Sequence, residues 1–131
     1  MNNKRFDVGC KVLGRIRVSD FKQRPGLKYY IMVTNGDCMN SNQSPIRIKD
    51  GDYIICHYVE SWFDAANRII VFKTKGACYI KHLTFVDMVN GYICVKCYYP
   101  QEMELWVKMA DVEMLSIVDK VCTNDVLNQI M

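Results

Sequence analysis

Cys38 and Lys81 are the two side chains of this 131-residue chain whose types and positions could support covalent chemistry. Cys38 comes just after the turn residues Asn35-Gly36-Asp37, which follow an apolar run that is typical of a strand. A nucleophile on a turn at the end of a strand is a common arrangement for attack on an amide. Lys81 lies in another apolar run, and a lysine in apolar surroundings can give up its proton and act as a base. The pair therefore predicts acyl-transfer chemistry.

The surroundings of Lys81 decide whether it can be a base. On a strand over 78–85, alternate side chains share a face, and those that share the face of Lys81 are Tyr79, Leu83 and Phe85. An isolated lysine more often lays its aliphatic stem along apolar surface and keeps its ammonium in water. The residues alone leave both interpretations open.

Short strands and turns must position the two residues. The Cys38 segment lies between two apolar runs, 29–34 and 53–59, and closes with the turn Asp50-Gly51-Asp52. Asn90-Gly91 predicts a hairpin, and 61–67 is expected to be a loop with at most one helical turn. The pattern predicts an all-β fold, a barrel or sandwich of short strands with little helix. The expected strands cover 8–19, 29–34, 53–59, 68–73, 78–85, 92–99, 104–108 and 112–122.

The composition is that of an ordinary globular domain, half apolar and about a quarter charged. No apolar run approaches the ~20 residues that span a bilayer, and the first residues lack the apolar core of a signal peptide. We therefore expect a cytoplasmic protein without membrane contact. In that compartment the seven cysteines are expected to be reduced thiols. No cofactor is expected.

Positive charge is concentrated near the N-terminus. Residues 1–28 carry eight Lys and Arg against two Asp, whereas the remainder carries nine basic and twelve acidic residues. We divide the chain into a basic N-terminal arm (1–28), a domain (29–122) and a C-terminal tail (123–131). The charge of the basic arm predicts contact with DNA as one alternative, and a solvated basic segment is the other.

The spacing of these motifs resembles the signature of the LexA-type self-cleaving peptidases, a family that includes phage repressors and UmuD-like proteins and is related to bacterial signal peptidases. The resemblance covers roughly 29–122. Lys81 stands at the spacing at which the family's catalytic lysine follows its nucleophile. The residues that carry the resemblance are Gly36-Asp37-Cys38-Met39, Asp50-Gly51-Asp52 and Tyr79-Ile80-Lys81-His82-Leu83.

The resemblance implies a LexA- or signal-peptidase-like barrel with Cys38 as nucleophile and Lys81 as general base. It implies that the backbone amides of Asp37 and Cys38 form the oxyanion hole. It also implies a homodimer built from C-terminal strands, including 112–122, with the chain itself or a partner protein as substrate. The motif residues with an implied structural role are Gly36, Met39, Gly51 and Asp52.

The chain departs from the family at the nucleophile, which is cysteine where the family has serine. A thiol is more acidic than a lysine ammonium, so the pair has the option of resting as thiolate and ammonium. The thiolate is also the better leaving group, so turnover requires Lys81 to protonate the departing nitrogen. In addition, residues 1–37 contain no Ala-Gly or Cys-Gly dipeptide, the family's cleavage site. The 28 residues before Tyr29 are too few for a helix-turn-helix domain, so a conventional repressor is not expected.

Three functions stay open at this stage. The first is slow cleavage of the chain itself or of a partner. The second is a catalytically inert module of the same fold, for homodimerisation or for interaction in the DNA-damage response or phage regulation. The third is nucleic-acid contact through the basic arm.

The spacing of two cysteines raises the question of a metal site. Cys94 and Cys97 have the spacing of a zinc knuckle, but on a strand they point to opposite faces, and no second pair stands nearby. Cys78 and His82 share a face, yet two ligands do not make a site. We therefore expect no metal.

Overall fold

The computed structural model describes residues 4–7, 12–13, 16–17 and 24–122, and their regular secondary structure is almost entirely antiparallel strand. A short ribbon pairs β2 (Val12–Leu13) with β3 (Ile16–Arg17). Two short helical turns, α1 (Trp62–Ala65) and η2 (Met109–Asp111), connect strands. The strands of the main sheet are β1 (Lys4–Asp7), β4 (Tyr29–Val33), β5 (Tyr53–Tyr58), β6 (Ile69–Thr74), β7 (Ala77–Asp87), β8 (Tyr92–Cys97), β9 (Met103–Lys108) and β10 (Met114–Cys122).

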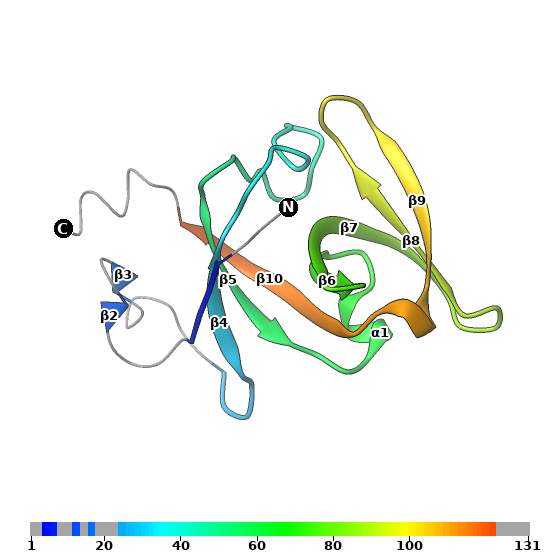
Figure 1. The fold of residues 1–131 in the computed structure, drawn as a ribbon, viewed down its shortest axis with the longest axis horizontal. Helices are drawn as coiled ribbons and strands as arrows, with labels where there is room; N and C mark the ends of the chain where they lie inside the picture. The colour runs from blue at the N-terminus through cyan, green and yellow to red at the C-terminus, as the bar shows by residue number, and fades with distance from the viewer. Residues whose placement is uncertain (1–3, 8–11, 14–15, 18–23, 123–131) are drawn as a thin grey trace.

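The main sheet has the strand order β1-β4-β5-β10-β6-β7-β8-β9 (Figure 1). The late strand β10 lies in the middle and is hydrogen-bonded to β5 on one side and to β6 on the other. β1 and β9 are the two ends of the order, so the sheet is open rather than closed into a barrel. The predicted all-β class with little helix is confirmed. Within the described residues, neither helical turn is long or apolar enough to cross a membrane.

Each strand expected from residue 29 onward has a counterpart within a few residues of its predicted bounds, and the expected helical turn is α1. The N-terminal region differs, because β2 and β3 stand where one strand over 8–19 was expected. The other residues of that prediction, and the tail 123–131, lie outside the described residues. In the basic arm, Lys4–Asp7 pairs with β4 and thus belongs to the main sheet.

Alternate residues of the strands fill two apolar clusters. On β6, Ile69 and Val71 belong to one cluster, whereas Ile70 and Phe72 belong to the other, as expected from side chains that alternate between the faces of a strand. Burial of each such side chain contributes about 1.5–3 kcal/mol to stability. The first cluster also takes Met39 and Ile48, which come from the long connection between β4 and β5 (residues 34–52, hereafter the Cys38 loop). The core therefore anchors the Cys38 loop.

A bulge in β7 changes the face predicted around Lys81. Leu83 pairs with Val95, but Phe85 pairs with the adjacent Cys94, so the register shifts by one residue between them. Leu83 is fully buried, whereas Phe85 is 54% exposed. The prediction that Phe85 shares the face of Lys81 is therefore wrong, because a bulge reverses the alternation beyond it.

The two ends of the Cys38 loop are bound to each other around Thr34. The Thr34 amide donates to the Asp52 carbonyl (2.8 Å), and the Gly51 amide donates back to the Thr34 carbonyl (3.1 Å). The buried Thr34 hydroxyl lies 2.9 Å from the Lys49 carbonyl oxygen and 3.0 Å from that of Asp52. Asp52 is buried as well, and its carboxylate accepts from the Lys49 amide at 2.8 Å.

We predict that Thr34→Val destabilises the fold by about 1 kcal/mol, because valine keeps the shape but removes the hydroxyl hydrogen bond, while both carbonyls keep their backbone donors. Urea unfolding measures the change. Thr84→Val is the matched control, since the exposed Thr84 hydroxyl also donates to a carbonyl, that of Cys94 at 3.2 Å. The control should change stability by less than about 0.5 kcal/mol. Equal effects of the two substitutions would count against a bracing role for Thr34.

Candidate active site

Hydrogen bonds to its backbone carbonyl hold Cys38 in place. That carbonyl accepts hydrogen bonds from the Tyr98 amide (2.8 Å) and the Tyr99 amide (3.0 Å), which follow directly after β8. The Cys38 loop therefore meets the end of β8, although the two segments are far apart in the sequence (Figure 1). The backbone of the candidate nucleophile is fixed from both directions, by the core cluster beneath Met39 and by β8.

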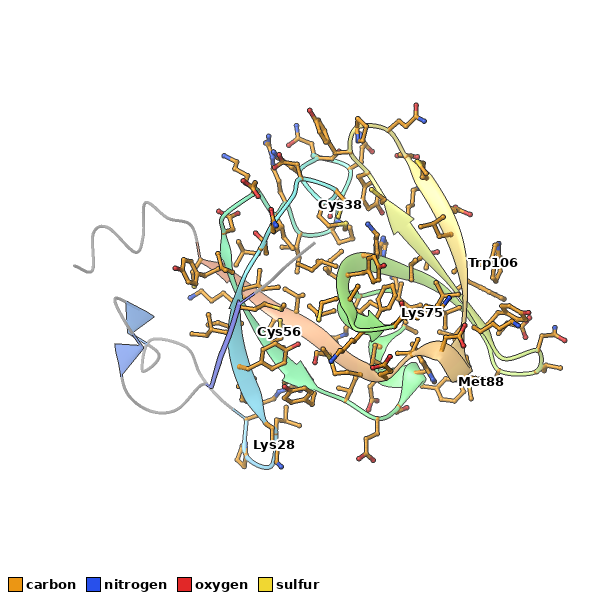
Figure 2. All side chains as sticks on the ribbon, viewed as in Figure 1. Lys28, Cys38, Cys56, Lys75, Met88 and Trp106 are labelled. Carbon is orange, nitrogen blue, oxygen red and sulfur yellow. The ribbon has the colours of Figure 1, made fainter. Side chains whose placement is uncertain are left out.

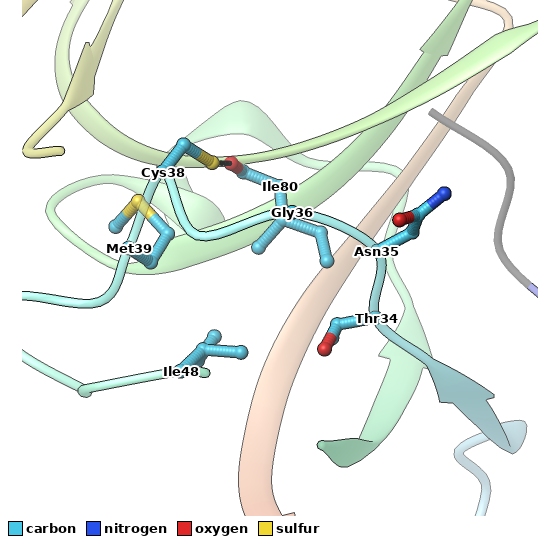
Figure 3. Close-up of a pocket in the computed structure, with 7 residues that line it drawn as sticks. All are labelled: Thr34, Asn35, Gly36, Cys38, Met39, Ile48 and Ile80. Carbon is cyan, nitrogen blue, oxygen red and sulfur yellow. Dashed lines mark hydrogen bonds between the residues drawn. The ribbon is translucent and has the colours of Figure 1, made fainter. Parts of the chain in front are cut away.

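The half-buried Cys38 side chain points toward β7. Its Sγ lies 3.2 Å from the Ile80 carbonyl oxygen and donates to it (Figure 3). Only a protonated thiol can donate this bond, so the resting group is the thiol. The adjoining pocket has a volume of about 10 Å³, roughly the space of one water molecule. It is lined by Thr34, Asn35, Gly36, Cys38, Met39, Ile48 and Ile80.

Lys81 and Cys97 both act electrostatically on Cys38. Burial is the largest influence and raises the pKa of the Cys38 thiol above its usual value. The positive charge of Lys81 and a hydrogen bond with its ammonium lower this pKa, while the Cys97 thiol raises it. Burial prevails, and the structure does not favour the resting thiolate and ammonium that the acidity difference allowed. It does bring Cys38 and Lys81 together.

The sheet register places Lys81 on the face of the second apolar cluster, whereas Cys38 packs against the first. Lys81 pairs with Ile70 on β6, so it shares the face of the second apolar cluster and is half-buried. On the other side of β7, β8 ends at Cys97. Beyond that end the Cys38 loop lies beside β7 and contacts Ile80 through the thiol. The nucleophile therefore occupies the place that β8 leaves free.

The remaining motif residues brace the turn that carries Cys38. The Asp37 carboxylate accepts from the Asp50 amide (2.9 Å) and from the Asn40 side chain (3.2 Å). The Asp50 carboxylate in turn accepts from the Gly36 amide at 2.7 Å. Gly36 and Gly51 have φ angles of 104° and 85°, a region that glycine enters without strain. Both glycines thus allow the two turns to meet.

The backbone amides assigned to the oxyanion hole are those of Asp37 and Cys38. Among the described residues, neither amide donates a hydrogen bond to another protein group. Both amides are therefore available to an incoming oxyanion, and their role stays a prediction. Met39, expected near the cleft, is buried and lines the pocket.

Cys97 is a neighbour of the site that the sequence did not reveal. Its Sγ lies 3.5 Å from the Cys38 carbonyl oxygen and 3.3 Å from that of Tyr99. The spacing to Cys94 suggested only a metal pair, and Cys94 instead lies 3.7 Å from a Glu104 carboxylate oxygen. Within the described part of the chain, no group of three potential ligands among His, Cys, Asp and Glu could hold a metal.

His82 ties β7 to the segment that holds Cys38. Its Nδ1 lies 2.6 Å from the Tyr98 hydroxyl, and its Nε2 lies 3.0 Å from the Asn67 side-chain oxygen. Burial lowers the pKa of His82, which favours the neutral ring with Nε2–H donating to Asn67 and Nδ1 accepting from Tyr98. His82 is thus a positioning residue, since the Tyr98 amide contacts Cys38. The other histidine, His57, instead pairs with Asp119 at 2.6 Å.

Comparison with known proteins does not assign a family. No protein-family model matches the sequence, and no curated protein matches it. The resemblance to LexA-type peptidases therefore rests on the motif residues. Nucleic-acid contact through the basic arm also stays a prediction of the sequence, because the side chains of residues 1–23 lie outside the described residues.

We predict that Lys81→Met raises the pKa of Cys38 further, because it removes the positive charge and hydrogen bond that oppose burial. The thiolate is the reactive form, so iodoacetamide labelling of Cys38 should need a higher pH in the variant than in the wild type. Peptide-resolved mass spectrometry over a pH series measures the labelling rate. Lys73→Met removes another half-buried lysine, on β6, and should leave the profile unchanged. Identical profiles for all three proteins would refute the coupling.

Proposed function

We propose that this chain is a peptidase-like regulatory protein of the LexA type, in which Cys38 attacks an amide and Lys81 transfers the proton. One observation carries the proposal. The Cys38 thiol, on a turn braced by Asp37, donates a hydrogen bond to the Ile80 carbonyl, and Lys81 is near enough to lower the pKa of that thiol. A nucleophile, a base and unengaged backbone donors are the parts that acyl transfer needs.

In the proposed reaction the Cys38 Sγ forms a bond to the carbonyl carbon of the substrate amide. Once the Lys81 ammonium has lost its proton to water, its amine takes the Sγ proton, and the negative charge on the former carbonyl oxygen is met by the amides of Asp37 and Cys38. Lys81 then gives its proton to the departing nitrogen as the carbon–nitrogen bond breaks. This last transfer is decisive, because an unprotonated amide nitrogen leaves less readily than the thiolate.

The products of the first step are a free amine and a thioester at Cys38. Water attacks the thioester carbon with Lys81 as base, the carbon–sulfur bond breaks, and the sulfur recovers a proton. The acid formed is released, so atoms and charge balance over the cycle. Because the pKa of the Cys38 thiol is raised, the rate should increase with pH on the alkaline side.

The pocket constrains the substrate. About 10 Å³ beside Cys38 admits a methyl group or a hydrogen and excludes larger side chains. The substrate in this proposal is a protein segment, of this chain or of a partner, and the small pocket favours a small residue next to the cleaved bond. We propose the cytoplasm as the compartment, because Cys38, Cys56, Cys78, Cys94, Cys97 and Cys122 are all free thiols.

An inert interaction module of the same fold is the second candidate. The raised pKa of the Cys38 thiol favours it, because a smaller fraction of reactive thiolate is present near neutral pH. Exposed apolar side chains on β9 favour it as well, since such side chains on one strand mark an interaction surface. The two candidates differ in whether Lys81 affects chemistry at Cys38.

We predict that p-nitrophenyl acetate acylates Cys38 and that the acetyl group is then hydrolysed with the help of Lys81. Intact-mass spectrometry follows formation and loss of the acetyl adduct, and Cys38→Ala should abolish the adduct at this site. Lys81→Met should slow turnover by about 10²-fold or more, the usual contribution of a general base. The same proteins held at alkaline pH are examined for cleavage of their own chain.

The matched controls are Cys78→Ser and Lys73→Met, which alter half-buried residues of the same types on β7 and β6. Both should behave like the wild type. Cys38→Ser separates the two candidates, because it restores the family's smaller nucleophile. Turnover in Cys38→Ser with none in the wild type would identify a retained site made idle by sulfur. Turnover in the wild type that is unaffected by Lys81→Met would rule out the proposed pair.

A further inference from the structure

β9 is an edge strand that carries large apolar side chains into solvent. It pairs with β8 on one side and ends the strand order of the main sheet on the other. Trp106 is 59% exposed and projects away from the ribbon of β9 (Figure 2). Met103 and Leu105 are 46% and 45% exposed. Long apolar edges of this kind pair readily with another strand.

The backbone groups on the free side of β9 can be identified from the ladder with β8. The Met109 amide donates to the Gly91 carbonyl at 2.9 Å, immediately beyond the pair of Tyr92 and Lys108. Hydrogen-bonded and non-hydrogen-bonded pairs alternate in an antiparallel ladder. The backbone groups of Val107 therefore point toward β8, as do those of the other odd-numbered residues. The backbone groups that point to the free side are those of Glu104, Trp106 and Lys108.

These three residues are negative, neutral and positive in order, so their charges are complementary to those of an antiparallel second copy. If a second β9 lies antiparallel with Trp106 opposite Trp106 of the second copy, Glu104 lies opposite Lys108 of the second copy at both ends. All three pairs then have backbone groups that point toward each other, as a hydrogen-bonded ladder requires. A shift by two residues in either direction keeps the ladder but separates the opposite charges. The centred register is thus the one that satisfies both backbone and charge.

We propose that β9 joins two copies of this chain in an isologous dimer, as a continuous antiparallel sheet centred on Trp106. On one face, Trp106 makes an edge-to-face contact with Phe85 (centroids 6.0 Å apart, 75° between planes), and the dimer extends this aromatic row across the axis. On the other face, Leu105 of each copy lies opposite Val107 of the second. An isologous contact of this type closes after two copies.

β10 is already paired within the chain. The resemblance implied a dimer through C-terminal strands that include 112–122, but β10 is hydrogen-bonded to β5 and β6 within the chain. β6 covers one edge of β10 over Met114–Ile117, and β5 covers the other over Ser116–Cys122. The free edge of the described sheet that combines exposed apolar residues with complementary charge is that of β9. The dimer proposal therefore does not depend on the proposed catalysis.

The test uses charge reversal on the full chain. Glu104→Lys and Lys108→Glu each place like charges opposite one another at both ends of the dimer, and each should raise the dissociation constant by about tenfold or more. Sedimentation velocity over a concentration series measures it. An equimolar mixture of the two variants should form a heterodimer of near wild-type affinity, because opposite charges then face each other again. The double variant should also dimerise.

Glu102→Lys is the matched control, since the exposed Glu102 pairs with Lys96 at 3.3 Å but lies outside β9. It should dimerise like the wild type. Circular dichroism verifies that each variant is folded, independently of its association. A wild-type chain that is monomeric at its highest soluble concentration would overturn the proposal. So would a mixture of the two single variants that associates no better than either one alone.

Discussion

Two backbone hydrogen bonds hold the candidate site together, those from the amides of Tyr98 and Tyr99 to the carbonyl of Cys38. They attach a nineteen-residue loop to the end of a strand that lies almost sixty residues later in the chain. Other contacts of the Cys38 loop are its own turns, the apolar side chains of Met39 and Ile48, and the thiol contacts with Ile80 and Cys97. Without the two bonds, the thiol would not be fixed beside β7, where it meets Lys81.

The chemistry of the site follows from a competition between burial and charge. Burial among apolar residues stabilises the neutral Cys38 thiol, and the nearby Lys81 stabilises the thiolate. Burial prevails, and the thiol donates a hydrogen bond to the Ile80 carbonyl at rest. The thiol becomes more reactive when the pH is raised, or when a substrate displaces that hydrogen bond and the deprotonated Lys81 takes the thiol proton.

The same hairpin connects the site with the proposed dimer surface. β8 ends at Cys97 beside Cys38, and Cys97 pairs with Met103 at the start of β9. His82 supports this region by its hydrogen bond to the Tyr98 hydroxyl. Pairing of β9 with a second copy would therefore order a strand whose first residue is bonded to the segment that holds the nucleophile. Association and chemistry have a direct structural route by which each can influence the other.

The sequence by itself determined the all-β class, nearly all strand positions after residue 29, and the turns at Gly36 and Gly51, because these depend on local alternation and on backbone freedom. It also singled out Cys38 and Lys81. Only the tertiary structure decided that the two side chains meet, that Cys97 and His82 stand beside them, and that Phe85 leaves the face of Lys81. Contacts between distant segments, and a bulge that reverses alternation, depend on strand pairing. The same holds for β10. Its central place in the sheet follows from the pairing of distant strands and cannot be read from the residues of β10 alone.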